Sequence, residues 1–106
     1  SKWANPPDMA AQSIPRNKFP IALKKARGAL GVPQERFSLA SSRTYVSSLE
    51  RGIKSPTLNK IDALAEVLEL HPLTLLTLSY LGDGGGPSVQ DLFKRVTDEL
   101  ARVQSK

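Results

Sequence analysis

The 106-residue sequence contains no cysteine and one histidine, His71. The first absence excludes a disulfide framework and thiolate metal sites, and the second excludes a zinc site built from several histidines. No stretch approaches the roughly 20 apolar residues of a membrane-spanning helix, and the N-terminal residues lack the apolar core of a signal peptide. We therefore expect a cytoplasmic protein without a metal, a cofactor or a membrane segment.

The patterns of an enzyme are also missing. The glycines at 84–86 follow no strand pattern, which argues against a phosphate-binding loop, and no paired carboxylates lie on a recognisable scaffold. His71 precedes Pro72, a position typical of a helix-start cap or a packing residue. We predict no catalytic residue, and the sequence indicates no pocket for a small-molecule effector.

Acidic residues are scarce in one half of the chain. Residues 16–54 contain nine lysines and arginines against two glutamates, a net charge of +7, whereas residues 55–106 carry −2. A basic surface can serve solubility alone, but such asymmetry favours a polyanionic partner for the first half.

The apolar residues predict an all-α protein with five short helices between 17 and 81. Apolar spacing indicates helices over 17–30 and 34–39, the second anchored by Phe37. Ser42 caps a third over 43–51, Thr57 caps a fourth, and Pro72 opens a fifth. The fourth helix has the apolar stripe Leu58, Ile61, Leu64, Ala65 and Leu68.

The remaining segments divide the chain further. Residues 1–16 contain prolines but no apolar period, which predicts a flexible arm, and 82–87 form a glycine-rich linker. Residues 88–106 form a sixth helix, which Ser88 and Asp91 begin as a capping box does. The apolar stripe of this helix must be buried on something, because a lone helix of about 16 residues is only marginally stable in water. It either covers the five-helix domain or, as we favour, pairs with a second subunit through Val89, Leu92, Phe93, Val96 and Leu100.

The third helix has an unusual outer face. Val46, Leu49 and the following Ile53 point one way. The opposite face combines short hydroxyls and arginines without an acid, namely Arg43, Thr44, Ser47, Ser48 and Arg51. Short side chains let a helix approach base edges, and an arginine can bind guanine with two hydrogen bonds.

Seven short segments of the chain occur together in a characteristic order. They cover residues 23–27, 31–35, 42–47, 49–52, 55–58, 61–65 and 70–76. In their order, and nearly in their spacings, residues 23–76 resemble the lambda-repressor-like, or xenobiotic-response-element (Cro/C1-type), helix-turn-helix family.

The resemblance implies roles for individual residues. Base edges are read by Arg43, Thr44 and Ser48. It assigns phosphate binding to Gln34, Thr57, Asn59 and Lys60, and to this set we add the neighbouring Ser47, Arg51 and Lys54. Arg27 and Glu50 form a structural ion pair between the first and third helices, and the core includes Leu39, Val46, Leu49, Ile61, Leu64 and Leu76.

Two departures from the family pattern stand out. The segment between Glu35 and Ser42 is about two residues shorter and lacks the turn glycine, so we expect a different tilt of the recognition helix. Pro33 replaces the usual serine cap before the second helix, which removes an acceptor but keeps a favourable φ.

The sequence thus predicts a transcriptional regulator that binds double-stranded DNA in the major groove with residues 43–51, as a homodimer on two half-sites. The alternative is an antitoxin that binds DNA with the same domain and a partner toxin with its last helix.

Overall fold

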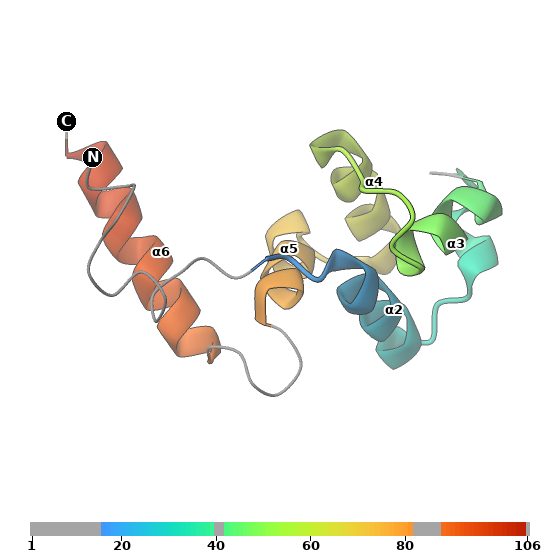
Figure 1. The fold of residues 1–106 in the computed structure, drawn as a ribbon, viewed down its shortest axis with the longest axis horizontal. Coiled ribbons are helices and arrows are strands. Elements are labelled where there is room, and N and C mark those ends of the chain that lie inside the picture. Colours follow the sequence, from blue (N-terminus) through green and yellow to red (C-terminus); the bar gives the residue numbers. More distant parts are fainter. Residues whose placement is uncertain (1–15, 40–41, 82–87, 106) are drawn as a thin grey trace.

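The computed structural model describes residues 16–39, 42–81 and 88–105. Within these ranges every regular element is helical, which confirms the predicted fold class. The elements are α2 (Phe19–Leu30), the 3-10 helix η1 (Gln34–Leu39), α3 (Arg43–Glu50), α4 (Leu58–Leu68), α5 (Pro72–Leu81) and α6 (Val89–Gln104) (Figure 1). The predicted linker and, except for Arg16, the predicted arm lie outside the described residues.

Helix α2 begins two residues later than predicted. Asn17 Oδ1 accepts a hydrogen bond from the Phe19 amide (3.3 Å), and Pro20 stands in the first turn, where a missing N–H costs no helical hydrogen bond. Gly31 ends the helix at φ 68°, the left-handed conformation expected of it. Ile21 and Leu30, two predicted apolar positions, are exposed; the buried side consists of Phe19, Ala22, Leu23 and Ala26.

The predicted starts of α3, α4 and α6 are confirmed, and each depends on a local hydrogen bond. The hydroxyls of Ser42, Thr57 and Ser88 each accept from the amide three residues on, at 3.1, 3.2 and 3.0 Å. His71 Nδ1 accepts from the Leu73 amide at 3.0 Å, which confirms its predicted capping role.

The second helix is a 3-10 helix rather than an α-helix. It has only six residues and follows Pro33, whose carbonyl oxygen accepts from the Arg36 amide at 3.0 Å. A segment this short satisfies its amides best through such tight turns. Phe37 is fully buried, as predicted, and the side chain of Leu39 lies outside the described residues.

The core lies between α2, η1, α3, α4 and α5, which we call the N-terminal unit (Figure 1). The core predictions for Val46, Leu49, Ile61 and Leu64 are confirmed. On α5 the fully buried apolar residue is Leu75, and the predicted Leu76 is half-buried. The reason is that α5 is apolar nearly all round, so its pattern does not specify which side faces inward.

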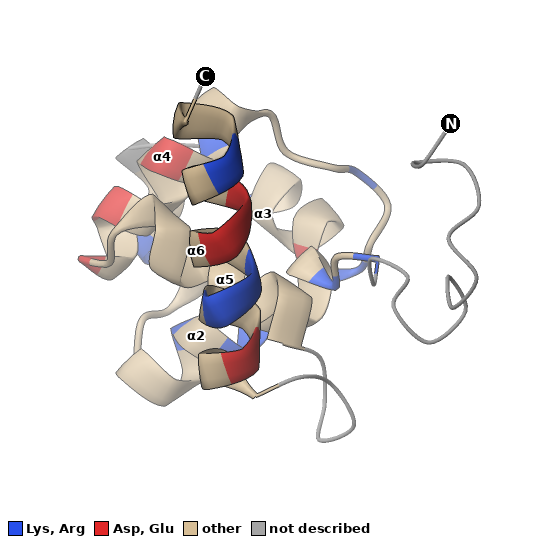
Figure 2. Ribbon diagram, turned by 90° about the vertical axis from the view of Figure 1, so that its left-hand side faces the viewer, with Lys and Arg blue, Asp and Glu red and all other residues tan. Residues whose placement is uncertain are grey.

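Helix α6 lies at one end of the molecule and makes its main contact with α5 (Figure 1). None of its residues is buried. Figure 2 shows acidic and basic residues alternating along this helix. No helix in the described ranges has the length and apolar character that crossing a membrane requires.

Candidate nucleic-acid interface

The exposed side of α3 is built from its first residues. Arg43 and Thr44 are exposed, while Val46 and Leu49, on the opposite side, are fully buried. No acidic residue lies in the first turn of α3. Successive residues of a helix are turned by about 100°, so burial of one side orients the start of α3 and Arg51 toward solvent.

The prediction that Ser48 lies on the outer face of α3 and reads a base is wrong. Its side chain is only 7% exposed, so it does not share the outer face with Arg43 and Thr44. The chain folds back after α3, and the amides of Ile53 and Lys54 both donate to the Ser48 carbonyl oxygen at 2.9 and 3.5 Å. The same turn leaves Ile53 exposed, although its spacing predicted the inner face.

Arg43 has an acidic neighbour in η1. Its Nη2 lies 3.7 Å from Glu35 Oε1, and both side chains are mostly exposed. An exposed pair at this distance contributes little to stability. It nevertheless sets a carboxylate beside the arginine that the sequence predicts to read a base.

Arg27 and Glu50 form an ion pair that connects α2 to α3. Arg27 Nε and Nη2 donate to the two carboxylate oxygens of Glu50 at 2.6 and 3.1 Å. The side chains are 20% and 6% exposed. Hydrogen bonding to Glu50, reinforced by the charge of that carboxylate, raises the pKa of Arg27 above its ordinary value. This bidentate geometry fixes the direction of α3 relative to α2.

Gln34 joins this pair, which the sequence did not predict. Its Nε2 donates to Glu50 Oε1 at 3.0 Å. The contact connects residues 16 positions apart, so no local pattern could have revealed it. The side chain predicted to bind a phosphate is thus engaged with Glu50 in the protein without DNA.

The segment between α3 and α4, together with the first turn of α4, contains most of the residues predicted to bind phosphate. Gly52 turns the chain at φ 75° after α3. Around this turn, exposed side chains come from Arg51, Lys54, Thr57 and Asn59, with Lys60 half-buried; Ser47 on α3 is half-buried as well.

A tyrosine that the sequence analysis did not single out lies among these lysines. Tyr45 is half-buried on α3, and the ammonium groups of Lys54 and Lys60 lie 5.7 and 5.3 Å from its ring centroid. Both distances are within the range of a cation–π interaction. The one sequence feature that could have drawn attention to Tyr45 is its position three residues after the Ser42 cap.

On α6 the residues predicted to form a dimer interface are accessible. Leu92 is half-buried, and the others are exposed by 38–51%, namely Val89, Phe93, Val96 and Leu100. Two ion pairs run along the helix, Lys94–Asp98 at 2.9 Å and Arg95–Glu99 at 3.2 Å. Its amphipathic character is therefore kept in the folded chain.

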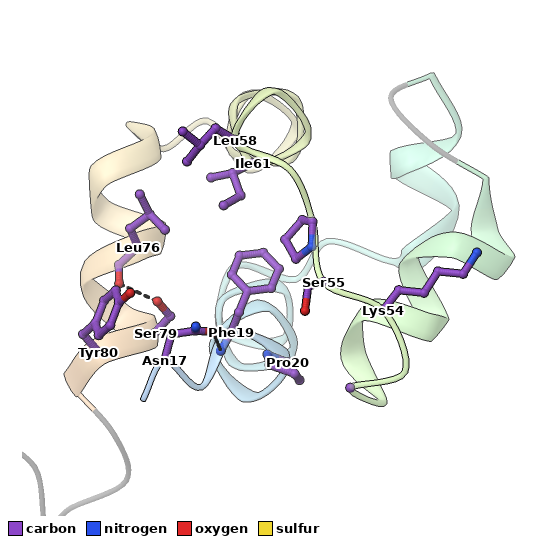
Figure 3. A pocket seen from close by; sticks show the side chains of 12 residues that line it. Asn17, Phe19, Pro20, Lys54, Ser55, Leu58, Ile61, Leu76, Ser79 and Tyr80 are labelled. Atoms are coloured by element: carbon purple, nitrogen blue, oxygen red, sulfur yellow. Dashed lines mark hydrogen bonds between the residues drawn. The ribbon is translucent and has the colours of Figure 1, made fainter. Parts of the chain in front are cut away.

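A pocket of about 240 Å³ lies between the start of α2, the turn before α4, and α5 (Figure 3). Its polar side chains include Asn17 and Ser79, but these are already used within the protein. Asn17 accepts from the Phe19 amide, and the Ser79 hydroxyl donates to the Leu76 carbonyl oxygen at 2.6 Å. The Asn17 Oδ1 atom and the Ser79 hydroxyl proton are thus engaged within the protein. Within the described ranges no group of residues has the composition of a metal site.

Comparison with known proteins identifies the N-terminal unit. The family model described as "Helix-turn-helix" matches residues 23–75, half of the chain, from within α2 to within α5. No curated protein and no solved structure gave a match. The buried side of α3 and the Arg27–Glu50 pair agree with this match. The chain belongs to the Cro/C1-type helix-turn-helix family of DNA-binding transcription regulators.

Proposed function

We propose that the protein is a homodimeric transcription regulator in which α3 of each subunit reads one half-site in the major groove. The observation that carries the proposal is the orientation of α3. Arg43 and Thr44 face solvent beside a basic turn, while Val46 and Leu49 anchor the opposite side in the core. A helix held in this way can enter the groove without unfolding any part of the protein.

Base reading is assigned to Arg43 and Thr44. Arg43 is the first residue of α3, and recognition helices of this kind contact base edges with their N-terminal residues. Its guanidinium can donate two hydrogen bonds to one guanine. Ser48 is left out of the base-reading set because it is buried.

Phosphate binding is assigned to the turn between α3 and α4. The side chains of Arg51, Lys54 and Thr57 are exposed there, next to the amides at the start of α4, and Asn59 is exposed in the first turn of that helix. Helix N-termini and cations both favour phosphate. Ser47 and Lys60 flank this set, and Gln34 joins it if DNA binding draws its amide from Glu50.

Dimerisation is assigned to α6, with a second copy of the chain as the partner. The exposed apolar residues are separated by alternating steps of four and three, which is the a/d spacing of a two-stranded coiled coil. Phe93 and Leu100 occupy a positions, and Val89, Val96 and Val103 occupy d positions. A stripe of this spacing is self-complementary, and two-fold pairing also gives a second recognition helix.

The same apolar face supports the alternative function, an antitoxin that binds a partner toxin through α6. The two functions differ in the state of the purified chain. A homodimer forms without any other protein, whereas an α6 reserved for a toxin leaves the chain monomeric. Light scattering across a range of protein concentrations distinguishes them.

The proposal is tested by selecting bound fragments from genomic DNA and measuring affinity by fluorescence anisotropy. We expect one repeated sequence in two half-sites about one helical turn apart. We also expect the affinity to fall about a thousandfold between roughly 50 and 200 mM salt, because phosphate contacts release counterions. A failure to enrich any sequence, or a flat salt response, would contradict the proposal.

A further inference from the structure

One aromatic ring on the recognition helix has two lysines near it. The Nζ atoms of Lys54 and Lys60 lie 5.7 and 5.3 Å from the centroid of the Tyr45 ring. The lysines come from different segments, since Lys54 precedes the Thr57 cap and Lys60 lies in the first turn of α4. Figure 3 shows the Lys54 side chain extending away from Phe19 and toward α3.

The position of the ring is determined by the fold. The Tyr45 amide donates to the Ser42 hydroxyl at 3.1 Å, which fixes the start of α3. The side chain is half-buried and packs against the core cluster that contains Val46 and Leu49. A ring held by the core gives the lysines a fixed point of attachment, which flexible lysine stems do not have on their own.

The two lysines add to a local concentration of positive charge. Lys54 and the exposed Arg51 lie between α3 and α4, and Lys60 lies in the first turn of α4. The negative face of the aromatic ring attracts both ammonium groups. A phosphate is attracted by the same positive charge.

We propose that Tyr45 is a positioning residue, whose ring gathers Lys54 and Lys60 into one clamp for a DNA phosphodiester next to the recognition helix. This inference rests on the proposed DNA binding and adds a residue to it. The ring connects the helix that reads bases to the lysines that bind the backbone, so α3 and the phosphate contacts move as one body.

The geometry is tested first without DNA. The ring current of Tyr45 shifts the Hε resonances of Lys54 and Lys60 upfield in the NMR spectrum of the free protein. We expect Tyr45→Phe to keep these shifts and Tyr45→Leu to abolish them, with the Hε resonance of Lys94 on α6 as an internal control. Ordinary Hε shifts of both lysines in the unaltered protein would overturn the inference.

The function of the clamp is tested on duplex DNA. We expect Tyr45→Leu to weaken binding to specific and random duplexes alike, by about three- to tenfold, while Tyr45→Phe binds as the unaltered protein does. The slope of log affinity against log salt should become shallower by about one per lost phosphate contact. If Tyr45→Leu loses structure and the slope stays unchanged, the ring has a purely structural role, and the inference is overturned.

Two further variants separate the inference from the proposed function. In a Lys54→Gln/Lys60→Gln background, Tyr45→Leu should have no further effect on affinity, and an undiminished effect would contradict the clamp. Failure of the unaltered protein to bind any duplex would count against the proposed function, whereas normal binding by Tyr45→Leu would count against the clamp alone.

Discussion

The N-terminal unit and α6 differ in where their apolar side chains lie. In the unit, side chains from η1 and four helices form one buried cluster that includes Leu23, Phe37, Leu49, Leu64 and Leu75. In α6, which has 16 residues, no side chain is buried. The unit therefore has a core of its own, whereas α6 leaves its apolar face exposed, which is why we propose that a second copy of the chain covers it.

Their ion pairs differ in the same way. The Arg27–Glu50 pair is largely removed from solvent, and it connects two helices. The pairs of α6 lie within one helix and are exposed, although the hydrogen bond to Asp98 raises the pKa of Lys94 above its ordinary value. The comparison indicates that charge is structural in the unit and mainly a solubilising feature on α6.

The largest expected effect tests this contrast. Arg27→Met leaves the Glu50 carboxylate buried without its cation, which should lower the free energy of unfolding by about 3–5 kcal/mol. The matched variant Arg95→Met removes a cation from an exposed pair on α6 and should change it by less than about 0.5 kcal/mol. Denaturant unfolding followed by circular dichroism measures both, and equal effects would contradict the contrast.

The next prediction concerns the α6 face. Phe93→Asp places a charge at the centre of the apolar stripe and should weaken dimerisation at least about a hundredfold, because a charge buried in such an interface lacks a partner. Ala101→Asp, on the exposed side of the same helix, is the control and should leave the dimer intact. Light scattering gives the mass of each variant. A dimeric Phe93→Asp would place the interface elsewhere.

A smaller effect is expected at Glu35. Glu35→Gln removes the carboxylate 3.7 Å from Arg43, so random-duplex affinity should rise about two- to fivefold. Glu66→Gln changes the net charge equally but lies on α4 and should have a weaker effect. Anisotropy titrations with one random duplex compare the affinities of the two variants. An equal rise in affinity would show that the effect of Glu35→Gln comes from net charge alone.

The sequence predicted the features that depend on neighbouring residues. The caps at Ser42, Thr57 and Ser88 each need one hydroxyl and an amide three residues away, so their pattern suffices. Apolar spacing supplied the order of the helices. The family resemblance supplied the pairing of Arg27 with Glu50, which no local spacing could indicate.

The features it missed depend on tertiary arrangement. Ser48 is buried, and the chain folds back onto its carbonyl oxygen after α3; its polar character gave no sign of either. The apolar composition of α5 did not specify that Leu75 faces inward rather than Leu76. The Gln34–Glu50 hydrogen bond and the lysines around Tyr45 connect separate segments, so they depend on how the helices pack.

Sequence-specific regulation by this protein requires that the exposed start of α3 reads base edges. The most direct test measures base preference at every position of the selected site for the unaltered protein and for Arg43→Ala. We predict that Arg43→Ala loses discrimination at one position per half-site, by about 1–3 kcal/mol, and keeps it at the others. An equal loss of affinity on all sequences, with every preference unchanged, would contradict the claim.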